Sequence, residues 1–74
     1  METIKHFLNK HDYEYQEDRD GNLTVDCGGQ DYRYWNLVKL IQENIEAWTY
    51  DLLLSIRIEI DLSYETVTFK RRNS

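Results

Sequence analysis

Leu54-Ser55-Ile56-Arg57-Ile58-Glu59-Ile60-Asp61-Leu62 is the stretch that decides the fold, because aliphatic and polar residues alternate along it without a break. Strict alternation is typical of a strand with one buried face. Upstream, a second set of apolar residues recurs at helical spacing: Val38, Ile41, Ile45, Trp48 and Leu52. A helix therefore precedes a strand, which indicates a domain that combines helices with a sheet.

The residues after this stretch predict a hairpin. The inward residues of its first strand are even-numbered, whereas Val67 and Phe69 are odd-numbered, so the loop must have an even length. A four-residue loop, 62–65, places Ile60 opposite Val67 and Ile58 opposite Phe69. The same register places Arg57 opposite Lys70, which is a mild like-charge penalty.

Residues 13–27 predict an earlier hairpin. A two-residue loop at Asp20-Gly21 would throw its apolar side chains onto opposite faces. A three-residue turn, 19–21, with Gly21 in the left-handed position keeps them together. The pairs that follow are Asp18 with Asn22, Tyr15 with Val25, and Tyr13 with Cys27.

A short helix is expected before the first hairpin. Thr3 is a suitable N-cap, and the helix should end near His11 or Asp12. Two turns of helix do not hold together alone in water, so its apolar face must lie on the sheet. The residues of that face are Ile4, Phe7 and Leu8.

The sequence does not determine where the main helix begins or where it ends. Asp31 or Asn36 can cap it, so residues 31–35 are either helical or extended. The apolar spacing continues to Leu52, but residues 48–51 are poor helix formers. We place the boundary near Trp48, within the interval 48–53.

These elements predict an α+β fold of the order α-β-β-α-β-β, with a four-stranded antiparallel sheet and helices on one face. Residues 1–74 form a single compact domain, with 70–74 as a frayed basic tail. The single cysteine, Cys27, excludes an intramolecular disulfide, so packing or a partner must stabilise a thin core.

The charge distribution limits the kinds of partner that the protein can bind. Lys70, Arg71 and Arg72 hold three of the nine basic charges, so residues 1–69 carry 14 acids against six bases, a net charge of −8. Such a body repels phosphate, which disfavours direct binding of nucleic acid. No stretch predicts a membrane span or a signal sequence, and a cytoplasmic location is expected.

The sequence predicts no metal, no cofactor and no catalytic residue. Aligning Gly21 with the glycine of a calcium-binding EF-hand loop puts Gln16 and Cys27 where carboxylates are needed. His6 and His11 lie on different sides of a helix and cannot chelate a metal together. Cys27 falls on the inward face, which predicts a buried thiol. Since no other candidate reactive group is found, we expect that the protein is not an enzyme.

Two features remain as candidates for binding a partner. Acidic residues concentrate on the first hairpin, and exposed tyrosines are expected in two loops at the same end of the second hairpin. The partner-binding residues predicted from these features are Glu14, Glu17, Asp18, Asp20, Asp26, Tyr50 and Tyr64. Carboxylates can attract a basic surface, and tyrosines are enriched at the centre of interfaces.

The functional hypothesis is a non-enzymatic module that docks on a basic surface of a larger protein. In size and charge the chain is similar to small acidic inhibitors of nucleic-acid-handling proteins, including the anti-CRISPR and anti-restriction proteins of phages. That similarity implies a host-cytoplasmic inhibitor if the chain is phage-encoded. The alternative is a structural protein that forms a homodimer through its second hairpin or its aromatic surface.

Overall fold

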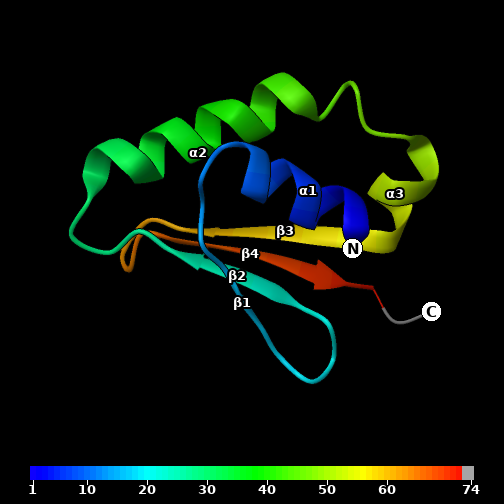
Figure 1. Ribbon diagram of the computed structural model, residues 1–74, viewed down its shortest axis with the longest axis horizontal. Coiled ribbons are helices and arrows are strands. Elements are labelled where there is room, and N and C mark those ends of the chain that lie inside the picture. Colours follow the sequence, from blue (N-terminus) through cyan, green and yellow to red (C-terminus); the bar gives the residue numbers. More distant parts are fainter. Residues whose placement is uncertain (73–74) are drawn as a thin grey trace.

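The computed structural model describes residues 1–72, and it contains three helices above one face of a four-stranded antiparallel sheet (Figure 1). The elements are α1 (Glu2–Lys10), β1 (Gln16–Glu17), β2 (Leu23–Asp26), α2 (Asp31–Asn44), α3 (Tyr50–Ser55), β3 (Ile56–Asp61) and β4 (Thr66–Arg71). The strand order is β1-β2-β4-β3. The predicted α+β fold is confirmed, and α3 is an additional short helix directly before β3.

Strand β4 lies at the centre of the sheet, and its inward side chains form the floor of the core. Val67 and Phe69 are both fully buried. On one side Ile60 and Ile58 oppose them across the 62–65 loop, which confirms the predicted register of the second hairpin. On the other side they pair with β2: Val25 opposes Val67, and Leu23 opposes Phe69.

The turn of the first hairpin also has the predicted form. Asp18 N–H donates to the Asn22 carbonyl at 3.0 Å, and Gly21 has a φ of 84°. The ladder is shorter than predicted, because β1 contains two residues and the pairs expected for Tyr13 and Tyr15 are not part of it.

The course of Tyr13 explains the shortened strand. Its hydroxyl donates to the Arg33 carbonyl at 2.9 Å and accepts from Asn36 Nδ2 at 2.8 Å, so it is fastened to α2. The Arg33 guanidinium lies 4.3 Å from the centre of the same ring. These contacts draw the chain before β1 toward the helices and away from β2.

Helix α1 buries Ile4, Phe7 and Leu8 as predicted, but its cap is different. Lys5 N–H donates to the Met1 carbonyl at 2.9 Å, so the first turn begins one residue before Glu2. Thr3 therefore lies inside the helix, and its predicted role as N-cap is wrong. The helix ends at Lys10, with His11 as the C-cap.

Helix α2 begins at Asp31 with Gln30 as its N-cap, so residues 31–35 are helical and the predicted caps, Asp31 or Asn36, are wrong. It ends at Asn44, earlier than predicted, and its buried residues are Tyr34, Leu37 and Ile41. Ile45 is the C-cap and 37% exposed, so its predicted place on the buried face is wrong. The chain turns after Ile45, and Thr49 is the N-cap of α3, where its hydroxyl accepts from Leu52 N–H at 3.2 Å.

The basic residues at positions 70–72 are ordered by the sheet. Lys70 and Arg71 belong to β4, and Arg72 N–H donates to the Ser55 carbonyl at 2.9 Å. The frayed tail predicted for 70–74 is therefore wrong for these three residues, because backbone hydrogen bonds continue to the end of β4. Residues 73–74 lie outside the described part of the chain.

Replacing Phe69 tests the central role of β4. Phe69→Ala should lower the free energy of unfolding by about 3–5 kcal/mol, because it opens a cavity at a fully buried site. A core of this size supplies about 3–5 kcal/mol in total, so most chains should be unfolded at room temperature. Urea denaturation followed by circular dichroism measures the change. Tyr50→Ala, at a 75% exposed ring, is the control; comparable losses in both variants would contradict this arrangement of the core.

Candidate functional site

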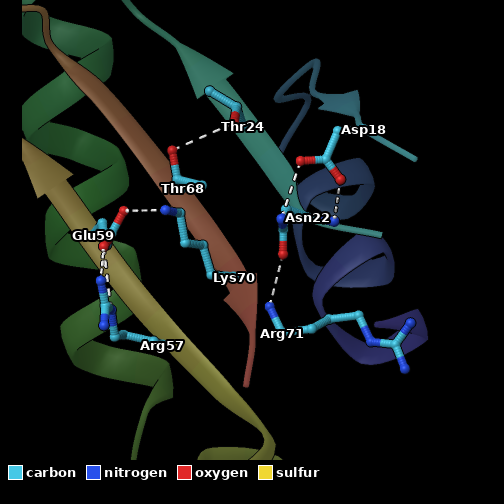
Figure 2. A network of polar contacts seen from close by, with 8 residues as sticks. All are labelled: Asp18, Asn22, Thr24, Arg57, Glu59, Thr68, Lys70 and Arg71. Carbon is cyan, nitrogen blue, oxygen red and sulfur yellow. Dashed lines mark hydrogen bonds and ion pairs between the residues drawn. The ribbon is translucent and has the colours of Figure 1, made fainter. Parts of the chain in front are cut away.

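The sheet face away from the helices carries a polar surface whose charge changes sign along the strands. At one end, Asp26 and Asp61 flank Thr66 in a row across three strands. Neighbouring strands are about 4.8 Å apart, so these two acids lie roughly 10 Å from each other. In the middle of the face, the hydroxyl oxygens of Thr24 and Thr68 are 3.3 Å apart (Figure 2).

The other end of this face is basic. Arg57 and Lys70 oppose each other as predicted, and Glu59 lies between them and contacts both (Figure 2). Lys70 Nζ is 3.2 Å from Glu59 Oε1, and Arg57 Nε donates to Glu59 Oε2 at 3.1 Å. Hydrogen bonds from Arg57 and Lys70 lower the pKa of Glu59. The bridging carboxylate offsets the like-charge penalty expected for this pair.

Three carboxylates at the acidic end of this sheet face also accept hydrogen bonds from the backbone of nearby turns. Asp26 accepts from Gly28 N–H at 2.8 Å, Asp61 accepts from Tyr64 N–H at 3.1 Å, and Glu65 accepts from Gly29 N–H at 3.2 Å. Each of these bonds uses one carboxylate oxygen. The turn after β2 and the loop between β3 and β4 are therefore fastened by acids, which places the negative charges in fixed positions.

Glu65 also meets a carboxylate of α2. A side-chain hydrogen bond with Asp31 is the main cause that raises the pKa of Glu65, and burial raises it further. Burial is also the main cause that raises the pKa of the Tyr34 hydroxyl, with Asp61 and Glu65 adding to it. The N-terminal turn of α2 thus faces the same negative region.

Two of the acids predicted as site residues lie in this region. Glu14 and Asp26 line a shallow hollow together with Asp12 and Arg33. The Arg33 guanidinium is engaged there, because it donates to the Asp12 carbonyl at 2.7 Å. We call the whole region the acidic end, and its carboxylates are Asp12, Glu14, Asp26, Asp31, Asp61 and Glu65.

The other predicted acids lie at the opposite end of β2. Glu17 faces the helices, where Lys5 Nζ approaches its carboxylate to 3.0 Å and gains a raised pKa from it. Asp18 accepts from the backbone N–H of Asp20 and of Asn22, and these bonds, led by that of Asn22, lower its pKa. Asp20 is exposed in the same turn.

The predicted acidic hairpin is therefore divided between two ends of the molecule. Asn22 connects its turn to β4, since Asn22 Oδ1 accepts from Arg71 N–H at 2.9 Å (Figure 2). Reversing the charges of Glu17 and Asp18 would break contacts of the fold, so these two residues are poor probes of binding.

The two predicted tyrosines are also separated. Tyr64 lies in the 62–65 loop at the acidic end and is 72% exposed, whereas Tyr50 begins α3 at the other end of β3. The expectation that both occupy one end of the second hairpin is wrong, because α3 turns the chain before β3 begins. Tyr32, 82% exposed beside Asp31 in α2, is a second tyrosine near the acidic end.

Neither a metal-binding cluster nor a membrane-spanning helix occurs among the described residues. Within residues 1–72, no group of three or more histidine, cysteine, aspartate or glutamate side chains is placed to hold a metal ion. Cys27 is buried as predicted, and burial is the main cause that raises its thiol pKa. No helix in this part of the chain is long and apolar enough to cross a membrane.

Comparison of the chain with protein-family models, with curated proteins and with solved structures finds no match.

The contact between Glu65 and Asp31 predicts a pH-dependent stability. A raised pKa means that folding favours protonated Glu65, so this contribution is present at low pH and is lost as the pH rises through the raised value. Glu65→Gln keeps an acceptor for Gly29 N–H and can donate to Asp31. It should raise the melting temperature at pH 7 and leave it nearly unchanged near pH 4.

The matched control for this prediction is Glu46→Gln, which removes the same charge from an exposed position after α2. Thermal denaturation of both variants at the two pH values gives the comparison. Equal gains in the two variants would assign the effect to net charge and contradict the proposed contact.

Proposed function

We propose that this protein is a non-enzymatic binding module whose acidic end docks on a basic surface of a larger protein. The observation that carries the proposal is the joining of six carboxylates from separate segments at one end of the sheet. A protein that handles nucleic acid presents a basic surface of the required kind. The proposed action is inhibition by occupying that surface, as small acidic phage inhibitors do.

The fixed positions of these charges support the proposal. Asp26, Asp61 and Glu65 are each held by a backbone N–H, so they lose little freedom when a partner binds. The second oxygens of Asp26 and Asp61 remain as acceptors, whereas Glu65 also bonds to Asp31. Complementary charge raises the rate of encounter with a basic partner and discriminates against acidic ones.

Exposed aromatic rings supply the second part of the proposed interface. Tyr64 and Tyr32 stand beside the acidic end with most of their surface in solvent. Tyrosine gives a large contact area and a polar tip, and such residues often dominate the binding energy of an interface. Charges would then steer the partner and the rings would anchor it.

Neutralising the acidic end tests the electrostatic part. The variant Glu14→Gln/Asp26→Asn/Asp61→Asn removes three charges, and its amide oxygens can still accept the turn hydrogen bonds. The control Glu43→Gln/Glu46→Gln/Asp51→Asn removes as many charges from exposed positions of α2, the following turn and α3. The immobilised proteins are used to capture partners from a cell lysate at increasing sodium chloride, with mass spectrometry as the readout.

The expected result is a basic protein that the wild type and the control retain and the acidic-end variant does not. Added duplex DNA should release it if its surface is a nucleic-acid site. The captured protein is then purified for direct calorimetry. Equal retention by all three forms, or retention unaffected by salt, would refute docking through the acidic end.

Tyr64 and Tyr50 form a matched pair for the aromatic part, because both are about three-quarters exposed but lie at opposite ends of β3. Tyr64→Ala should weaken binding of the captured protein by about tenfold, which is typical of an interface tyrosine. Tyr50→Ala should leave the affinity nearly unchanged. Calorimetry with the purified pair measures both, and a larger loss for Tyr50→Ala would place the interface elsewhere.

A further inference from the structure

Strand β3 is an edge strand, and within residues 1–72 it pairs with β4 alone. Arg72 N–H donates to the Ser55 carbonyl, so odd-numbered residues direct their backbone groups toward β4. The even-numbered residues of β3 consequently direct their N–H and C=O groups outward. Ile56, Ile58 and Ile60 form this outward row, which has no partner strand within residues 1–72.

The side chains along this edge are apolar on the helix side of the sheet. A hollow there is lined by Ile45, the C-cap of α2, by Leu53 of α3, by Ile56 and Ile58, and by two arginines, Arg57 and Arg72. Three further aliphatic side chains on or beside β3 are about half exposed or more: Leu54, Ile60 and Leu62. An edge with unpaired backbone groups and an apolar flank can accept another strand.

We propose that the occupant is β3 of a second copy of this chain, paired antiparallel about Ile58. In this register Ile58 opposes Ile58 of the second copy, and Arg57 opposes Glu59 in both directions. Ile56 then opposes Ile60, and Leu54 approaches Leu62. The stretch from Leu54 to Leu62 is thus complementary to itself when it is reversed.

The backbone and the charges together select this register. Apolar faces coincide only if even-numbered residues oppose even-numbered residues, and those residues carry the outward backbone groups. A shift by one residue of each strand would oppose Arg57 to Arg57 or Glu59 to Glu59. The register centred on Glu59 opposes Arg57 to Asp61 twice but also opposes two like charges, whereas the register about Ile58 opposes unlike charges twice and like charges nowhere.

The polarity of the open sheet face supports the same arrangement. Asp61 lies at the acidic end of β3, and Arg57 lies at its basic end. Antiparallel pairing brings Asp61 opposite Ser55 of the second copy, whose carbonyl is bonded to Arg72. Each acidic half of the edge therefore meets the basic half of the other copy.

Two features of the edge bear on its accessibility. Arg72 Nε donates to the Ile56 carbonyl at 3.0 Å, but a carbonyl oxygen has two lone pairs and can accept a second bond. Charged residues on an edge strand normally prevent pairing. Here Arg57 and Glu59 have opposite signs. They disfavour pairing with an unrelated strand and favour pairing with β3 of a second copy.

This inference goes beyond the proposed function and does not depend on it. The two acidic ends would face opposite directions along the strands of a joined eight-stranded sheet, with Asp61 of each copy at the seam. Asp26, Asp31 and Glu65 are not on the β3 edge and would stay accessible to another protein. The test uses the purified chain alone, so its outcome is separate from that of partner capture.

A charge exchange across the proposed pair tests the register. Arg57 and Glu59 have side chains 61% and 37% exposed, so their replacement should leave the monomer folded. Arg57→Glu alone and Glu59→Arg alone each create two like-charge pairs and should weaken the dimer by about tenfold. The double variant Arg57→Glu/Glu59→Arg restores both unlike pairs and should recover wild-type association, measured by sedimentation.

Mixing the two single variants gives a second test. One chain then carries two acids at these positions and the other carries two bases, so a mixed dimer has unlike charges at both pairs. It should form more readily than either variant associates alone. In hydrogen-exchange measurements, the protection of the Ile58 amide should increase as the fraction of dimer increases.

Four outcomes would overturn the proposal. They are a wild-type chain that stays monomeric at millimolar concentration, a dimer unaffected by either single change, a double variant that fails to recover, and an Ile58 amide protected only when another protein is present. Circular dichroism of each variant confirms that the fold is retained.

Discussion

The pairing of β2 with β4 is the constraint on which the rest of the structure depends. Each hairpin is local in sequence, but neither can bury its apolar face alone. Four residue pairs join them, from Leu23 opposite Phe69 to Asp26 opposite Thr66. Once joined, the two hairpins present one continuous apolar surface, which α1 and α2 cover. The same pairing brings Asp26 into line with Asp61, so the core and the acidic end have a common origin.

Local features of the chain were sufficient to predict both hairpins. Loop length and the face of each apolar residue are linked by parity, so the position of Val67 and Phe69 determines the register against β3. Gly21 supplies the left-handed conformation that the three-residue turn requires. Prediction failed where a distant contact decided the outcome. Tyr13 leaves the ladder because its hydroxyl bonds to α2, and nothing in its neighbourhood signals that contact.

The candidate site could be predicted only in part for the same reason. A run of acids along a hairpin is one feature of the sequence, but an antiparallel hairpin brings the two ends of the run together at one end of the sheet and places its middle in the turn at the other end. Glu14 and Asp26 therefore separate from Asp18. Asp61 and Glu65 enter the site from a segment far along the chain. Only the register between β2 and β4 shows that Asp61 and Glu65 join the site. The periodicity of apolar residues within either hairpin does not determine that register.

The acids of this protein combine a structural and an electrostatic role. Asp26, Asp61 and Glu65 each use one oxygen to hold a turn, so removing a side chain would change local structure as well as charge. Replacement of an acid by its amide separates these roles, because the amide oxygen can still accept the turn hydrogen bond. At the basic end the carboxylate of Glu59 bonds to side chains instead of the backbone, because it forms ion pairs with both Arg57 and Lys70. Charge on this surface is therefore fixed by the fold, and a partner would meet a pattern that is already in place before it binds.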